Sequence, residues 1–158
     1  MKAGKIIRLV FSIAVCQAAG LVGSLFTMPS IPTWYASLNK PFFAPPSWLF
    51  GPVWITLYIL MGVSLYLVWS KGLKNKSVKN SLLIFFVQLL LNALWSFLFF
   101  GLRSPLYGFV EIIALWIVIL LAILKLYKIS KNAALLLLPY IAWVTIAAIL
   151  RPKEIHGL

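Results

Sequence analysis

The sequence predicts an all-α integral membrane protein, a single domain of residues 1–158 built as a bundle of five transmembrane helices. Hydrophobic residues make up 63% of the chain, far above the usual half, and charged residues make up only 10%. The apolar residues gather in five long runs with short polar connections between them. These runs are too long and too uniform for the alternating strands of a membrane barrel, which leaves helices as the spanning elements.

A helix needs about 20 residues to cross a hydrocarbon core of about 30 Å, and only the fifth run falls short of this length. No cleavage site for a signal peptide cleanly follows the first run, so we expect it to be retained as a helix. The predicted helices cover residues 6–28, 47–70, 80–101, 106–128 and 133–150, and a lid loop covers residues 29–46.

The first predicted helix carries small residues, among them Ala19 and Gly23 at a spacing of four. Small residues at this spacing let another backbone approach closely. The partner is either a helix of the same chain or a second copy of the protein, and we favour packing within one chain.

The stretch Trp34–Tyr58 is the most unusual part of the chain, because aromatic residues are interleaved there with four prolines. Each proline fixes φ, lacks an N–H and disfavours helical backbone at the residue before it. The first half is therefore predicted to be an irregular, stiff lid. The second half is predicted to be helical, with Trp54 and Tyr58 stacked on one face at i,i+4 spacing.

Four unusual side chains, one from each of the second to fifth predicted helices, lie at one predicted depth. This depth is roughly 9–10 Å below the lid side of the membrane. Asn92 and Tyr140 lie about one turn deeper. The turn at residues 102–105 is short, so the third and fourth helices are expected to be antiparallel neighbours. The four side chains of the layer are Trp54, Trp95, Glu111 and Trp143.

This layer has more than one explanation. Its tryptophans either line an internal aromatic pocket, which we favour, or belong to ordinary core packing. Glu111 is the single acid within the five runs. It is either functional, as buried membrane acids tend to be, or hydrated and paired with Arg103 near the interface. Asn92 and Gln88 either contact a ligand or link helices by hydrogen bonds.

The basic residues predict an orientation. Ten of the 14 Lys and Arg residues lie on the side of the N-terminus, and four lie on the side of the lid. The positive-inside rule therefore places the N-terminus in the cytoplasm and the lid outside, in a prokaryotic plasma membrane. The formal charge of +12 does not indicate a nucleic-acid partner, because the basic residues sit where they meet lipid headgroups.

Known catalytic patterns are missing from the sequence. It contains no HExxH, no cysteine pair, no glycine-rich phosphate loop and no paired carboxylates. The one histidine, His156, follows the last apolar run, so haem ligation is poorly supported. We expect no metal site and no required cofactor, and a flat apolar ligand without a metal fits the aromatic layer better.

Three stretches resemble the translocator protein family, also called the tryptophan-rich sensory protein or peripheral benzodiazepine receptor family. They read WYxxLxKPxFxPPxWxFGPVWxxLY at Trp34–Tyr58, QxxLNxxWSxxFFG ending at Gly101, and PYxxWVxxA at Pro139–Ala147. The resemblance spans nearly the whole chain, and the first stretch alone is long enough to be highly specific.

The resemblance implies a homodimeric membrane protein that binds protoporphyrin and other aromatic ligands. Tyr107 occupies a position that is often tryptophan in the family, and Glu111 is similar to an acid found in many members. Phe43 replaces a usual tryptophan. The sterol motif of animal members needs a base within five residues of a tyrosine, and after Tyr140 the first base is Arg151, so sterol binding by that motif is not supported.

We therefore expect a receptor or carrier for protoporphyrin-like tetrapyrroles and other planar lipophilic molecules, bound under the proline-rich lid. The alternatives are a light-dependent enzyme that degrades porphyrin and a proton-coupled tetrapyrrole transporter. The ligand-binding residues expected from the layer and the resemblance are Tyr35, Trp54, Tyr58, Asn92, Trp95, Tyr107, Glu111, Trp143 and Ala147.

Overall fold

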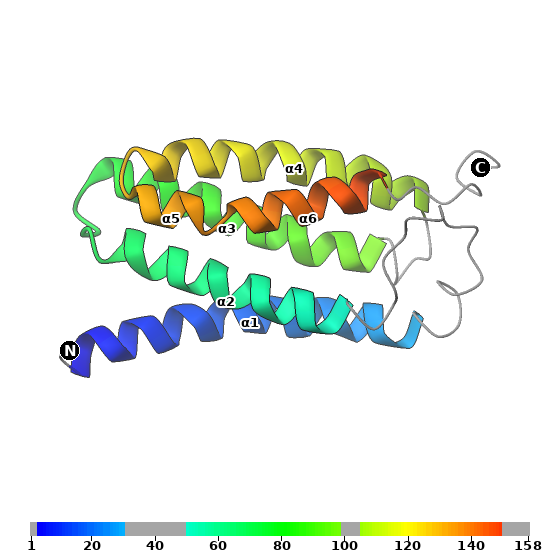
Figure 1. The fold of residues 1–158 in the computed structure, drawn as a ribbon, viewed down its shortest axis with the longest axis horizontal. Coiled ribbons are helices and arrows are strands. Elements are labelled where there is room, and N and C mark those ends of the chain that lie inside the picture. The colour runs from blue at the N-terminus through cyan, green and yellow to red at the C-terminus, as the bar shows by residue number, and fades with distance from the viewer. Residues whose placement is uncertain (1–2, 31–49, 99–104, 150–158) are drawn as a thin grey trace.

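The computed structural model describes residues 3–30, 50–98 and 105–149, and within them the side chains of residues 3–25, 51–98 and 106–149. Its described part contains five helical stretches long and apolar enough to cross a membrane, which confirms the predicted fold class. They lie side by side along the long axis of the molecule (Figure 1). The helices are α1 (Ala3–Ser30), α2 (Phe50–Trp69), α3 (Lys76–Ser96), α4 (Pro105–Tyr127), α5 (Lys131–Leu135) and α6 (Leu138–Ile149).

The third helix begins four residues before the predicted start at residue 80. The Asn75 side chain accepts a hydrogen bond from the Ser77 backbone N–H at 2.8 Å, so it caps the helix and satisfies a donor of its first turn. Hydropathy placed the start too late because this first turn is polar. α1 continues through residues 29 and 30, which were predicted to begin the lid. The rest of the predicted lid, residues 31–46, lies outside the described residues, as do the predicted first turn of the second helix at 47–49 and the predicted end of the third helix at 99–101.

The fifth span is interrupted, whereas the prediction had one helix over residues 133–150. α5 ends at Leu135 and α6 begins at Leu138. Pro139 explains the break, because it offers no N–H to the carbonyl of Leu135 and its ring collides with that carbonyl. The prediction of a continuous fifth helix was therefore wrong, although the stretch as a whole is long enough to span the membrane.

Glycines bring α1 close to its neighbours. A Cβ added at Gly62 of α2 would lie 2.4 Å from the Cα of Ile13 on α1. One added at Gly20 would lie 2.6 Å from the Tyr58 ring, and one at Gly23 would lie 3.0 Å from the Ser96 Oγ of α3. The small residues of α1 thus serve packing within the chain, the alternative that the sequence favoured.

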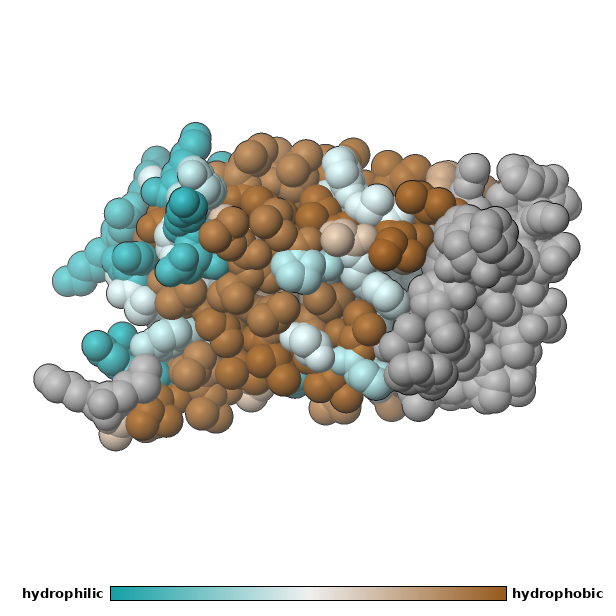
Figure 2. All heavy atoms as spheres, in the orientation of Figure 1, coloured by the Kyte–Doolittle hydropathy of each residue, from teal (hydrophilic) through white to brown (hydrophobic). Residues whose placement is uncertain are grey.

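The bundle buries a core between the helices and leaves apolar side chains on its outside. Met61, Phe85 and Ile119 are among the fully buried core residues, while Leu25 and Leu90 are about 70% exposed. On the face shown in Figure 2, apolar side chains form a broad belt, and hydrophilic side chains gather at the end that carries the N-terminus. This pattern is that of a helix bundle surrounded by lipid, and the protein is an integral membrane protein.

Candidate ligand-binding site

Aromatic rings from α2 and α6 meet near the end of the bundle opposite the N-terminus. The Trp54 ring centroid lies 5.7 Å from that of Tyr58, one helical turn further along α2. It also lies 6.4 Å from Tyr140 and 6.5 Å from Trp143, both on α6 and both edge-on. These distances and angles are those of favourable aromatic pairs. Trp54 is therefore the centre of a four-ring cluster that joins two helices, called the aromatic cluster below.

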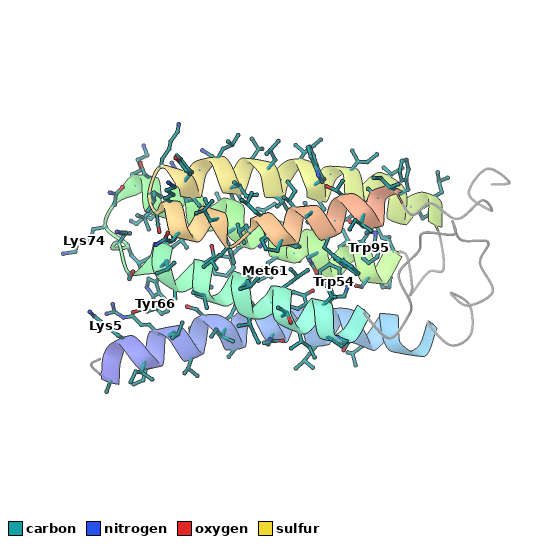
Figure 3. All side chains as sticks on the ribbon, viewed as in Figure 1. Lys5, Trp54, Met61, Tyr66, Lys74 and Trp95 are labelled. Atoms are coloured by element: carbon teal, nitrogen blue, oxygen red, sulfur yellow. The ribbon has the colours of Figure 1, made fainter. Side chains whose placement is uncertain are left out.

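The third helix reaches the same end of the bundle. In Figure 3, Trp95 of α3 and Trp54 of α2 both lie toward the end of the bundle opposite the N-terminus, with Met61 further toward the N-terminal end. Trp95, Trp143 and Ala147 are partly buried side chains that pack against the core. The structure thus gathers several of the predicted binding residues at one end of α2, α3 and α6.

A chain of buried hydrogen bonds lies directly below the aromatic cluster. The Tyr58 hydroxyl donates to Asn92 Oδ1, and Asn92 Nδ2 donates to the Tyr140 hydroxyl at 2.8 Å. The Tyr140 hydroxyl in turn donates to Gln88 Oε1 at 2.7 Å. These four side chains, called the polar junction below, link α2, α3 and α6. Asn92 therefore acts as an interhelical link, and its contact with a ligand stays a prediction.

Two buried side chains, Gln88 of the polar junction and Glu111 of α4, have polar atoms with no hydrogen-bond partner among the described residues. These atoms are Gln88 Nε2 and both carboxyl oxygens of Glu111. Gln88 is fully buried and Glu111 is 8% exposed, so water reaches them poorly. Unpaired buried groups of this kind are costly, and they offer a donor and two acceptors to a bound molecule. Arg103, the predicted partner of Glu111, lies outside the described residues.

For two further predicted residues, contact with a ligand stays a prediction. Tyr107, near the start of α4, is 58% exposed. Tyr35 lies outside the described residues, together with the lid that contains it. Within the part of the chain that the structure describes, no group of three His, Cys, Asp or Glu side chains could hold a metal ion.

Two members of the site were not among the predicted binding residues, Tyr140 and Gln88. Tyr140 touches Trp54 and joins the polar junction, and Gln88 ends that junction. Spacing contained a signal for both, because Gln88 precedes Asn92 by one turn and Tyr140 precedes Trp143 by three residues. The depth count places Tyr140 about one turn below the layer, and the sequence leaves Gln88 open between a ligand contact and an interhelical link.

Known proteins match the sequence of this chain along most of their length. A model of the TspO/MBR family matches residues 12–153. The chain is 53% identical over 146 residues to the tryptophan-rich protein TspO of Archaeoglobus fulgidus, covering 92% of this chain and 93% of the relative. It is 44% identical over 146 residues to the tryptophan-rich protein TspO of Chlorobaculum tepidum, covering 92% of each. It is 39% identical over 141 residues to the translocator protein of Homo sapiens, covering 86% of this chain and 83% of the relative. The chain therefore belongs to the TspO/MBR family.

Proposed function

We propose that the protein is a membrane receptor or carrier for protoporphyrin-like tetrapyrroles and other planar apolar molecules. The observation that carries the proposal is the aromatic cluster, in which Trp54 contacts Tyr140 and Trp143 from a second helix. Large flat rings stack on such side chains, and burial of both surfaces supplies most of the affinity. The names of relatives, tryptophan-rich protein TspO and translocator protein, agree with a role of this kind.

The aromatic cluster and the polar groups beside it would both contribute to ligand binding. In the empty site the rings of the cluster pack against one another, so little of their apolar surface is exposed to water. A bound ligand would replace ring–ring contacts at Trp54 with ring–ligand contacts. Gln88 Nε2 and the Glu111 carboxyl, which have no partner among the described residues, would orient the ligand's polar groups. The segment of residues 31–46 is proposed to cover the site as a lid, with Tyr35 as its contact.

The experiment that tests this proposal follows the absorbance of protoporphyrin IX with purified protein, in light and in darkness. A receptor quenches tryptophan fluorescence saturably and leaves the porphyrin spectrum intact in both conditions, which is the expected result. Bleaching in light that requires the protein would instead identify a porphyrin-degrading enzyme. Absence of saturable quenching in darkness would contradict binding itself.

Single replacement of Trp54, Trp95 or Trp143 by leucine should weaken protoporphyrin binding. Each should cost roughly 1–3 kcal/mol of binding free energy, the value of a desolvated aromatic anchor. Titration in darkness measures the effect. Trp69→Leu is the matched control, because Trp69 packs against Phe11 at the other end of α2. If the three variants bind like the control, the ligand site lies elsewhere.

The buried carboxyl of Glu111 favours a second candidate function, proton-coupled transport of tetrapyrroles. A proton-coupled carrier needs a membrane acid that changes protonation, and Glu111 is the one acid within the described spans. Glu111→Gln keeps the size of the side chain and removes its titration. We expect the variant to retain nearly all the porphyrin affinity of the parent. Proton-driven uptake into proteoliposomes by the parent, lost in the variant, would overturn the receptor proposal.

The assembly and orientation follow the same proposal. We propose a homodimer in a prokaryotic plasma membrane, with the N-terminus in the cytoplasm and the lid outside. The support for the orientation is the clustering of lysines at the N-terminal end, where Lys5 and Lys74 both lie (Figure 3). The support for the dimer is the family resemblance.

A further inference from the structure

The lysine-rich end of the bundle contains a cleft far from the aromatic cluster. The cleft has a volume of about 230 Å³, and it lies between the first turns of α3 and the end of α4. Ser81 in its wall precedes Trp95 by 14 residues on α3, or about 21 Å along the helix. The ligand site proposed above therefore does not account for it. Its lining residues are Ser77, Asn80, Ser81, Lys125, Lys128 and Ile129.

The polar groups of this cleft suit an anion. Lys125 and Lys128 supply two ammonium groups, and the serine hydroxyls and the Asn80 amide can donate hydrogen bonds. The chain has only two acids, Glu111 and Glu154. Glu111 lies 14 residues before Lys125 on α4, about 21 Å away, so within the described residues no carboxylate pairs with these lysines. The positive end of the α3 helix dipole faces the same side.

The surroundings of the cleft favour a lipid as the source of the anion. The cleft lies at the basic end of the bundle, which borders the apolar belt (Figure 2). Val87 follows Asn80 by seven residues and Leu121 precedes Lys125 by four, so both continue the lining faces of their helices into the belt. Val87 is 37% exposed and Leu121 is 44% exposed. The acyl chains of a lipid whose phosphate sits in the cleft would thus lie against partly exposed apolar side chains of α3 and α4.

We propose that this cleft binds the phosphate headgroup of an anionic phospholipid, with its acyl chains lying against α3 and α4. A zwitterionic lipid also carries a phosphate, but its choline cation would be repelled by Lys125 and Lys128. Basic sites between transmembrane helices on the cytoplasmic side are suited to such headgroups. This inference does not depend on the porphyrin proposal.

Native mass spectrometry of the full chain in a non-ionic detergent tests the proposal. Phosphatidylglycerol and phosphatidylcholine with the same acyl chains are added stepwise, and the bound fractions are compared. We expect phosphatidylglycerol to bind at least about tenfold more tightly. Lys125→Gln/Lys128→Gln should lower its affinity by about 30-fold, because each lysine near an anionic headgroup contributes roughly fivefold.

Lys71→Gln/Lys74→Gln is the matched control, since it removes the same charge from the neighbouring connection and these lysines do not line the cleft. It should bind phosphatidylglycerol like the parent, and both double variants should keep the parent's thermal unfolding midpoint. An equal loss of phosphatidylglycerol affinity in both double variants would mean that the effect comes from net charge alone. This result would contradict the proposed site. Equal binding of the two lipids would also overturn it. Displacement of phosphatidylglycerol by inorganic phosphate at equal concentration would show a site for free phosphate and refute the lipid assignment.

Discussion

Gly62→Ala should destabilise the protein by about 1–3 kcal/mol, the cost of adding a methyl group to a filled interface. The new Cβ would lie 2.4 Å from the Cα of Ile13 and 2.9 Å from its backbone N. No side-chain rotation relieves a collision with backbone, so α1 and α2 would have to move apart. Thermal unfolding of the purified protein in detergent micelles measures the loss.

Gly51→Ala is the control on the same helix, because a Cβ there meets no atom of the described residues within 4 Å. Alanine favours helix over glycine by about 0.5–1 kcal/mol, so this variant should be as stable as the parent or slightly more stable. If the two alanine variants unfolded at the same temperature, the close approach of α1 and α2 at Gly62 would be wrong.

Asn92→Leu should also be strongly destabilising, by about 1–3 kcal/mol for each buried group that loses its partner. Leucine has a similar volume, so the effect reports hydrogen bonds and not a cavity. The Tyr58 hydroxyl would lose its acceptor, while Tyr140 would keep its bond to Gln88. The same unfolding measurement gives the loss, which should exceed the average of about 0.6 kcal/mol for one hydrogen bond between transmembrane helices.

A double-mutant cycle with Tyr58→Phe makes this second test specific. Removal of the hydroxyl in advance leaves no stranded donor on α2, so Asn92→Leu should cost less in the Tyr58→Phe background than in the parent. We expect a coupling free energy of about 0.5–3 kcal/mol between the two positions. Strictly additive effects would mean that the polar junction does not hold α2 to α3.

The helices could be predicted because a membrane-spanning helix is apolar along its length, which hydropathy detects. The exact helix ends could not be predicted in this way, because they depend on single residues. The start of α3 rests on the Asn75 cap, which lies in a polar segment that hydropathy ignores. The break before α6 rests on Pro139, and a stricter use of the proline rule would have found it. Apolar content averaged along a run identifies the span but passes over both signals.

The depth of the site residues along their helices could be predicted, but the direction in which each side chain points could not. Counting residues from the helix ends placed Trp54 and Trp143 in one layer, and the structure brings their rings into contact. The same count could not show which way each side chain turns around its helix, because this rotation follows from packing between helices. The link from Tyr140 to both Asn92 and Gln88 therefore emerged only from the three-dimensional arrangement.

The interruption divides the fifth span into two parts that differ in what they contact. α6 has 12 residues, about 18 Å of helix, which is close to half of a hydrocarbon core of about 30 Å. It carries Tyr140 and Trp143, the aromatic members that this span contributes to the cluster. The short α5 carries none, and the Ser64 hydroxyl of α2 donates to its Ala133 carbonyl at 2.8 Å. The short part of this span is therefore tied to α2 through its backbone, and the longer part supplies the aromatic surface.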